Sequence, residues 1–128
     1  MGEKRRVMNT LDLFEQETEL DTFSAGNVIF DRGQPPRNMY VIKEGTVEIS
    51  IGEHTKFTLR HGGIFGEMAL IEPGERSATA ITKTDCGLIP IDEKRFTFLV
   101  QQTPFFAIHV MRILVSRLRK MNEILRQN

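Results

Sequence analysis

The sequence has one cysteine, Cys86, and no run of about 18 apolar residues that could cross a membrane as a helix. A single cysteine excludes an intramolecular disulfide. The basic N-terminus lacks the apolar segment of a signal peptide, and Arg6 stands where a myristoylation motif requires serine or threonine. We therefore expect a cytoplasmic protein that does not associate with a membrane.

The sequence also lacks an excess of either charge. Its 17 basic and 17 acidic residues give a formal net charge of zero, whereas proteins that wrap DNA or RNA are usually strongly basic. His54, His61 and His109 do not have the spacing of metal ligands, so no metal is expected. A nucleophile–base–acid set and a Walker-type loop are missing too, so we expect neither catalysis nor a cofactor.

The chain has 128 residues, of which 40% are hydrophobic and 27% are charged. This length and composition are typical of a single domain that buries a core without disulfides or metal. Residues 1–8 form a charged segment that we expect to be a flexible tail. Asn9 and Thr10 could cap a short helix that ends near Phe14.

Short β-rich runs separated by turn signals occupy the chain from Leu20 to Ile91. In the run from Val47 to Ile51, apolar residues alternate with polar ones, as in a half-buried strand. Short strands with frequent glycine turns favour a β-sandwich or barrel over a parallel α/β sheet.

After Asp92 the apolar residues recur at the spacing of a helix. Asp92 could cap a short helix that ends before Pro104. A long helix is predicted from Phe105 to about Arg126, with a heptad-like seam of Met111, Leu114, Leu118, Met121 and Leu125. Further apolar residues widen this surface: Ile108, Val110, Ile113, Val115 and Ile124.

Two interpretations of the long helix stay open. Its apolar surface could pack on two sides of its own barrel, or it could cover a ligand and pair with a second copy in a homodimer. Its basic residues could be a solvated face or a contact surface for nucleic acid or another negatively charged partner: Arg112, Arg117, Arg119, Lys120 and Arg126.

The most informative stretch runs from Gly62 to Thr79, with the sequence GGIFGEMALIEPGERSAT. Its glycines allow tight turns, and a short apolar run suited to one or two helical turns follows. Arg76 lies between small residues at the start of a strand-like segment. Backbone N–H groups at a helix start and an arginine fork together suit a bound anion, above all a phosphate.

This order of residues resembles the phosphate-binding cassette of cyclic-nucleotide-binding domains, the family that includes the catabolite activator protein and kinase regulatory subunits. The resemblance is carried by Phe-Gly-Glu-Met-Ala-Leu, starting at Phe65, and by Arg-Ser-Ala-Thr, starting at Arg76. It implies a mainly β fold: an eight-stranded jelly-roll barrel with a short N-terminal helix and two C-terminal helices, the last one long.

The resemblance also implies roles for individual residues. Arg76 would bind the cyclic phosphate, and Glu67 would accept a hydrogen bond from the ribose 2′-hydroxyl. Gly66 would let the backbone approach the ligand, and the N–H groups of Glu67 and Met68 would be available to it. Further ligand contacts are implied at Ser77, Ala78 and, through a purine edge, Asn122.

We therefore predict a sensor that binds cyclic AMP in preference to cyclic GMP and acts on an unknown downstream protein by movement of its C-terminal helix. Because the chain ends at Asn128, no helix-turn-helix domain and no direct DNA binding are expected. Two alternatives remain: a nucleotide-insensitive barrel that serves as a dimerisation or docking module, and an enzyme of the cupin type.

Overall fold

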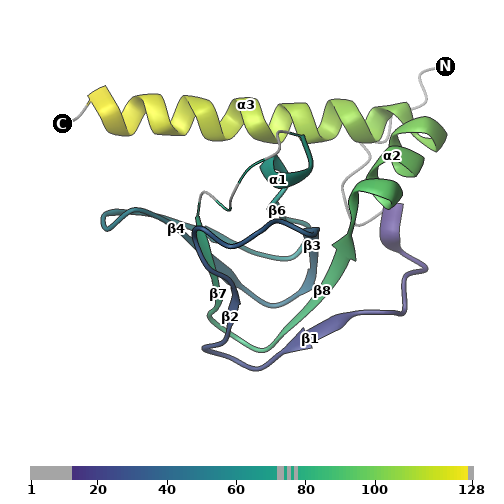
Figure 1. Cartoon of the computed structure of the whole chain (residues 1–128), viewed down its shortest axis with the longest axis horizontal. Helices are drawn as coiled ribbons and strands as arrows, with labels where there is room; N and C mark the ends of the chain where they lie inside the picture. Colours follow the sequence, from purple (N-terminus) through teal and green to yellow (C-terminus); the bar gives the residue numbers. More distant parts are fainter. Residues whose placement is uncertain (1–12, 72–73, 75, 77, 127–128) are drawn as a thin grey trace, which may run out of the picture.

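Two antiparallel sheets of four strands each form a barrel beneath a long helix in the computed structural model (Figure 1). The structure describes residues 13–71, 74, 76 and 78–126. One sheet has the strand order β1 (Asp21–Phe23), β8 (Cys86–Ile91), β3 (Met39–Glu44) and β6 (Ile64–Phe65). The other has the order β2 (Val28–Phe30), β7 (Thr79–Thr82), β4 (Val47–Ile51) and β5 (Thr55–Leu59). The predicted mainly β jelly-roll fold is confirmed.

The strands form where short β-branched and aromatic runs meet turn residues, and crossovers bring distant segments together. In the first sheet, β3 pairs with β8 from Met39↔Ile91 to Glu44↔Gly87. In the second, β4 lies between its hairpin partner β5 and the later strand β7. The segment before β7, which carries Arg76, therefore enters the sheet beside strands from the first half of the chain.

The interior contains two clusters of buried apolar side chains. One lies between the sheets and includes Phe30, Phe65 and Cys86. The second lies under the helices and includes Phe14, Ile64 and Phe106. Because β6 contributes Ile64 to one cluster and Phe65 to the other, it links the barrel interior to the layer beneath the helices.

The described residues include three α-helices. The first, α1 (Met68–Ile71), lies between β6 and β7, whereas α2 (Glu93–Gln102) and α3 (Pro104–Arg126) follow the last strand. Asp92 caps α2 as predicted, since its side chain accepts a hydrogen bond from the Arg95 N–H at 2.8 Å. Of the predicted N-terminal helix, only Leu13 and Phe14 are described, and they lie in a short 3₁₀ turn. The first α-helix among the described residues is therefore α1, within the cassette.

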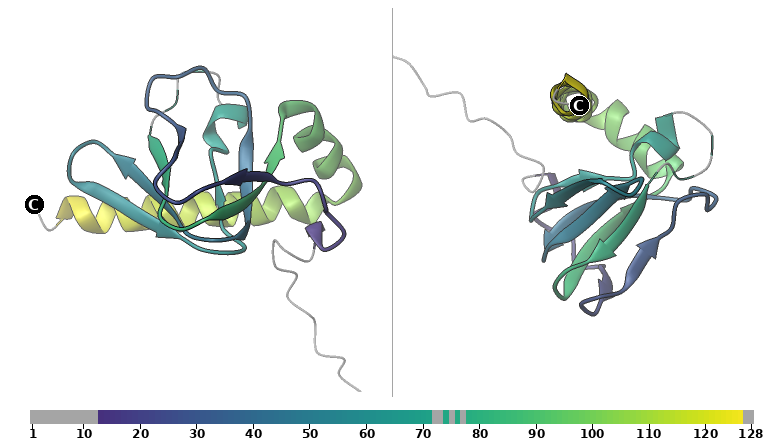
Figure 2. Two further views of the ribbon diagram at one scale, coloured as in Figure 1. Left: turned by 90° about the horizontal axis from the view of Figure 1, so that it is seen from below. Right: turned by 90° about the vertical axis from the view of Figure 1, so that its left-hand side faces the viewer.

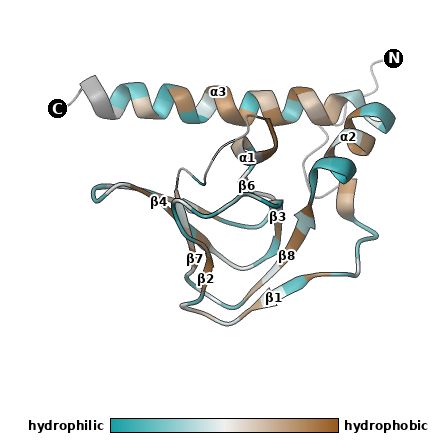
Figure 3. Ribbon diagram, in the orientation of Figure 1, coloured by the Kyte–Doolittle hydropathy of each residue, from teal (hydrophilic) through white to brown (hydrophobic). Residues whose placement is uncertain are grey.

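The long helix α3 lies along one side of the barrel, with α1 on the same side (Figures 1 and 2). Its inner face packs through Phe106, Val110 and Leu114 against the cluster under the helices. Figure 3 shows hydrophobic and hydrophilic bands alternating along α3. Its outer face exposes large apolar side chains: Phe105, Ile108, Met111, Val115 and Leu118. Among the described residues no single helix has the length and apolarity needed to cross a membrane, and α2 with α3 meets that test only as a pair bent by 116°.

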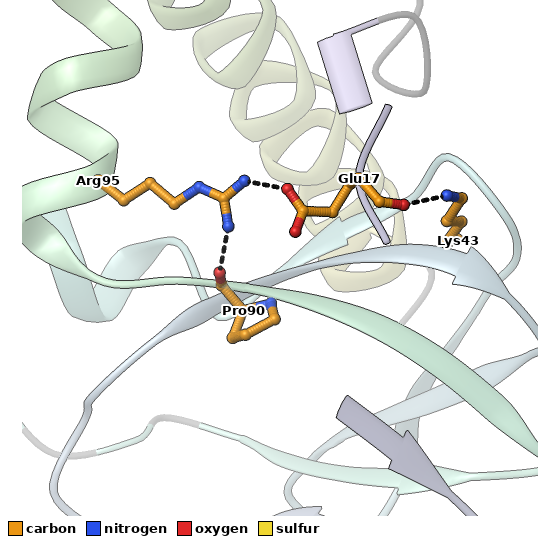
Figure 4. Close-up of polar contacts among 4 residues, drawn as sticks. All are labelled: Glu17, Lys43, Pro90 and Arg95. Atoms are coloured by element: carbon orange, nitrogen blue, oxygen red, sulfur yellow. Dashed lines mark hydrogen bonds and ion pairs between the residues drawn. The ribbon is translucent and has the colours of Figure 1, made fainter. Parts of the chain in front are cut away.

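Polar contacts join Glu17, in the segment before β1, to other parts of the molecule (Figure 4). Arg95 of α2 donates to the Glu17 carboxylate at 2.5 Å and to the Pro90 carbonyl at 3.3 Å. Lys43 of β3 donates to the Glu17 backbone carbonyl. This cluster of Glu17, Lys43, Pro90 and Arg95, hereafter the Glu17 cluster, ties the N-terminal segment to α2, β3 and β8.

Candidate functional site

Arg76 points into the barrel wall and is only 6% exposed. Its guanidinium lies 3.9 Å from the centroid of the Phe30 ring and donates hydrogen bonds to the carbonyls of Gly66, at 3.2 Å, and Asn38. Its backbone N–H donates to the Gln34 carbonyl at 2.9 Å. The loop before β3 and Gly66, directly after β6, therefore hold the guanidinium, while Gln34 fixes the backbone of the same residue.

A buried cation is expensive unless the protein compensates it. Burial lowers the pKa of Arg76, while the neighbouring Tyr40 and Glu67 act in the opposite direction. Since a guanidinium keeps its proton at neutral pH, the barrel wall carries a fixed positive charge at this point. A buried fork of this kind suits a phosphate, whose oxygens can accept two parallel hydrogen bonds.

Gly66 is the position where the backbone comes closest to that guanidinium. It has φ 77°, in the left-handed region that favours glycine, and a Cβ there would lie 2.8 Å from Arg76 Nη1 and 3.2 Å from the Asn38 carbonyl oxygen. Any side chain at this position would therefore displace the arginine fork. The close approach seen here is to the Arg76 guanidinium, and the predicted approach of the Gly66 backbone to a ligand stays a prediction.

Glu67 follows Gly66 and is 2% exposed, so its carboxylate also lies in the protein interior. The guanidinium of Arg117, from α3, donates one hydrogen bond to Glu67 Oε1 and another to the carbonyl of Ile64. One arginine therefore joins the long helix to the cassette and to β6. In the sequence, Arg117 is one of several basic residues of the last helix, and its spacing along α3 gives no sign of this partner 50 residues earlier.

Two buried polar atoms of this site have no hydrogen-bond partner among the described residues: Glu67 Oε2 and Arg76 Nε. One is an acceptor on an anionic group and the other is a donor on a cationic group. Leaving such a group unpaired in the interior costs about 1–3 kcal/mol. The site therefore offers one open acceptor and one open donor to a molecule that brings a hydroxyl and an anion.

The other predicted site residues lie in different surroundings. Ala78 is buried directly before β7, whereas Met68 begins α1 with its side chain 53% exposed. Asn122 is exposed on α3, and Ser77 lies outside the described residues. The structure thus brings Gly66, Glu67 and Arg76 together and adds Arg117. The ligand contacts predicted for the first three of these residues, and for Met68, Ser77, Ala78 and Asn122, all stay predictions.

A cavity of about 500 Å³ adjoins Arg117, between α3 and the β5–β6 region. Its lining residues come from β5, the turn between β5 and β6, the start of β6, and α3: Phe57, Thr58, Leu59, His61, Gly62, Gly63, Ile64, His109, Ile113, Ser116, Arg117 and Lys120. Burial and the nearby Arg112 lower the pKa of His109. Ile64 and Arg117 line the cavity and also take part in the hydrogen bonds beside Glu67, whereas Glu67 and Arg76 do not line it.

Residues 20–103 match the cyclic nucleotide-binding domain family, and the chain belongs to this family. It is 31% identical over 103 residues to the cyclic AMP receptor protein of Thermus thermophilus, a match that covers 77% of this chain and 48% of the relative. The chain spans about half the length of that protein and of a similar cAMP-activated transcriptional regulator from Mycobacterium tuberculosis.

Solved structures give the same assignment. The crystal structure of the Thermus thermophilus catabolite activator protein superimposes with a TM-score of 0.74 at 28% identity, covering 91% of this chain and 57% of that one. A chain solved in work on a cyclic-GMP-dependent signalling pathway in bacterial phytopathogenesis also has a TM-score of 0.74 at 28% identity, covering 86% of this chain and 91% of that chain. The resemblance inferred from the cassette is therefore confirmed.

Proposed function

We propose that this chain is a sensor module that binds a cyclic nucleotide between the cassette and α3, without a catalytic role of its own. The observation that carries the proposal is the pair of buried, unpaired atoms Glu67 Oε2 and Arg76 Nε. A cyclic nucleotide has a hydroxyl on its ribose and a negative charge on its ring phosphate. These two groups would complete the acceptor and the donor that the protein leaves open.

Each part of the ligand has a place in this arrangement. The phosphate would lie at the Arg76 fork, where Gly66 allows the close approach of the backbone. The ribose 2′-hydroxyl would donate to Glu67 Oε2, because Arg117 already occupies the other carboxylate oxygen. Cyclic AMP is the ligand predicted from the sequence, and the cyclic AMP receptor proteins among the relatives support it.

Titration calorimetry of the chain with cyclic AMP and with cyclic GMP tests this proposal. We expect saturable binding of at least one nucleotide with a micromolar or lower Kd. An absence of heat with both nucleotides, checked at two temperatures so that a vanishing enthalpy is not mistaken for no binding, would contradict the proposal. The chain would then be better described as a nucleotide-insensitive docking module.

The signal would pass through Arg117, which joins α3 to the carboxylate that receives the ribose. Ligand binding would favour the state in which α3 is held against the cassette, because that state provides a complete site. The variant Arg117→Met should therefore bind nucleotide more weakly and release α3 more readily in hydrogen exchange. Equal affinity and unchanged protection of α3 would contradict this mechanism.

The outer face of α3 would pair with the same face of a second copy. Ile108, Met111, Val115 and Leu118 are 41–61% exposed and follow one another at steps of three and four residues, the spacing of a coiled-coil seam. Sedimentation equilibrium should give a dimer that Leu118→Glu converts to a monomer. A monomeric wild-type chain at micromolar concentration would contradict this pairing.

A further inference from the structure

The ring of Phe30 lies against the guanidinium of Arg76. The Arg76 Cζ atom lies over the ring, 3.9 Å from its centroid, which is van der Waals contact. Both residues are buried, with exposed fractions of 8% and 6%. Water therefore screens little of the attraction between the cation and the negative face of the ring, and desolvated contacts of this kind are the strong ones.

Neighbouring aromatic rings fix the position of the Phe30 ring. Its centroid lies 5.9 Å from that of Phe65 on β6 and 6.4 Å from that of Tyr40 on β3. Tyr40 and Phe65 stack on each other at 5.4 Å with an interplanar angle of 23°. In the other sheet, Phe30 stands opposite Ala80 of β7. Residues of both sheets therefore set the place of the ring beside Arg76.

An aromatic ring can stabilise a cation without using its hydrogen-bond donors. A carboxylate would accept hydrogen bonds from the arginine fork and cancel its charge. The ring attracts the charge through its face and leaves the N–H groups at the edge of the guanidinium free. Two of these groups donate to the carbonyls of Gly66 and Asn38, and Nε has no partner within the part of the chain that the structure describes. The contact with Phe30 thus keeps a buried arginine charged and still able to bind an anion.

We propose that Phe30 is a positioning residue for the cyclic phosphate, because its ring holds the Arg76 guanidinium in the orientation that receives this group. The proposal rests on the proposed function, since it concerns the anion-binding end of the same site. Phe30 acts through Arg76 and does not itself contact the ligand. Without the ring, the guanidinium loses the surface that fixes one of its faces, and ordering it would oppose binding. Affinity should therefore fall although every hydrogen-bond donor is still present.

The test is titration calorimetry of the wild-type chain, Phe30→Leu and Phe30→Tyr with cyclic AMP and with cyclic GMP. Leucine removes the ring and keeps an apolar side chain, whereas tyrosine keeps the ring. For the nucleotide that the wild-type chain binds more tightly, we expect Phe30→Leu to lower the affinity about tenfold and Phe30→Tyr to stay within about threefold of the wild type. Phe30→Ile, whose branched side chain suits a strand, is the second ringless variant if Phe30→Leu does not fold.

The same comparison in an Arg76→Lys background separates positioning from a general effect on the barrel. An ammonium has no plane to orient, so loss of the ring should cost less than about threefold in affinity there. A loss of about tenfold in both backgrounds would show that Phe30 acts on the barrel as a whole, and it would overturn the proposal.

The matched control is Phe14→Leu. Phe14 is 3% exposed, and the Cζ atom of Arg95 in the Glu17 cluster lies over its ring, 5.7 Å from the centroid. The variant removes a buried ring beside an arginine outside the proposed site, so it should lower the melting temperature and leave nucleotide affinity unchanged. Equal losses of affinity in Phe14→Leu and Phe30→Leu, or no loss in Phe30→Leu, would overturn the role of Phe30 while leaving nucleotide binding intact. Failure of the wild-type chain to bind either nucleotide would instead overturn the proposed function.

Discussion

The candidate nucleotide site and the Glu17 cluster are both built from arginine, glutamate and backbone carbonyls, yet they differ in how completely their polar atoms are paired. At the site, Glu67 and Arg76 are 2% and 6% exposed, and each keeps one atom unpaired. In the Glu17 cluster, the side chains of Arg95 and Glu17 are 35% and 20% exposed, and among the described residues no buried side-chain atom of the cluster lacks a partner.

Under the proposed function, this difference separates a structural contact from a ligand-binding site. Water reaches the partly exposed groups of the Glu17 cluster, so their remaining hydrogen-bonding capacity carries little cost. The open atoms of Glu67 and Arg76 are shielded from water and retain the full cost of an unpaired buried group. On the proposed function, a ligand that pairs with these atoms would recover that cost as binding free energy.

The largest effect is expected at Arg76. Arg76→Ala should lower the affinity for cyclic nucleotide by about 3–5 kcal/mol, because the phosphate would lose its fork in a poorly hydrated pocket. Titration calorimetry measures the loss, and a thermal melt of the variant shows whether it is folded.

Arg76→Lys sharpens this comparison by keeping the charge and removing the planar fork. We expect its affinity to lie clearly below that of the wild-type chain. Wild-type affinity in Arg76→Lys would show that a positive charge suffices at this position and that the geometry of the fork is irrelevant.

A smaller effect, on stability alone, is expected at the Glu17 cluster. Arg95→Met should lower the free energy of unfolding by about 1 kcal/mol, because the variant loses a partly exposed ion pair and the hydrogen bond to Pro90. Denaturant titration measures this change. Nucleotide affinity should not change, and a large loss of affinity in Arg95→Met would remove the distinction between the two clusters.

The smallest effect is expected at His109, where burial lowers the pKa from its usual value of 6.5. Below that value the unfolded chain binds the proton before the folded protein does, so stability falls as the pH falls from about 7 to about 5. His109→Gln should flatten this part of the curve of unfolding free energy against pH. His54, whose side chain is 93% exposed, provides the control His54→Gln, and parallel curves for His109→Gln and the wild-type chain would contradict the assignment.

The sequence predicted the fold and much of the site because those features depend on local patterns. Glycine turns between β-rich runs indicated the strands, Asp92 indicated the start of α2, and the cassette indicated Gly66, Glu67 and Arg76. Each of these signals lies within a few residues of the feature that it predicts.

What the sequence did not predict depends on contacts between distant segments. Arg117 reaches Glu67 across 50 residues, and only the placement of α3 on the barrel brings them together. The predicted seam of α3 likewise mixed two faces: Leu114 and Met121 lie half-buried, whereas Met111 and Leu118 are exposed. Spacing along one helix could not show which apolar side faces its own barrel.

The central claim is that the open oxygen of Glu67 accepts the ribose hydroxyl, and a calorimetric cycle tests it most directly. The wild-type chain and Glu67→Ala are each titrated with a cyclic nucleotide and with its 2′-deoxy analogue. The account predicts that the missing hydroxyl costs the wild-type chain at least about tenfold in affinity and costs Glu67→Ala almost nothing. The same loss in both proteins would show that Glu67 does not hold the ribose and would contradict the account.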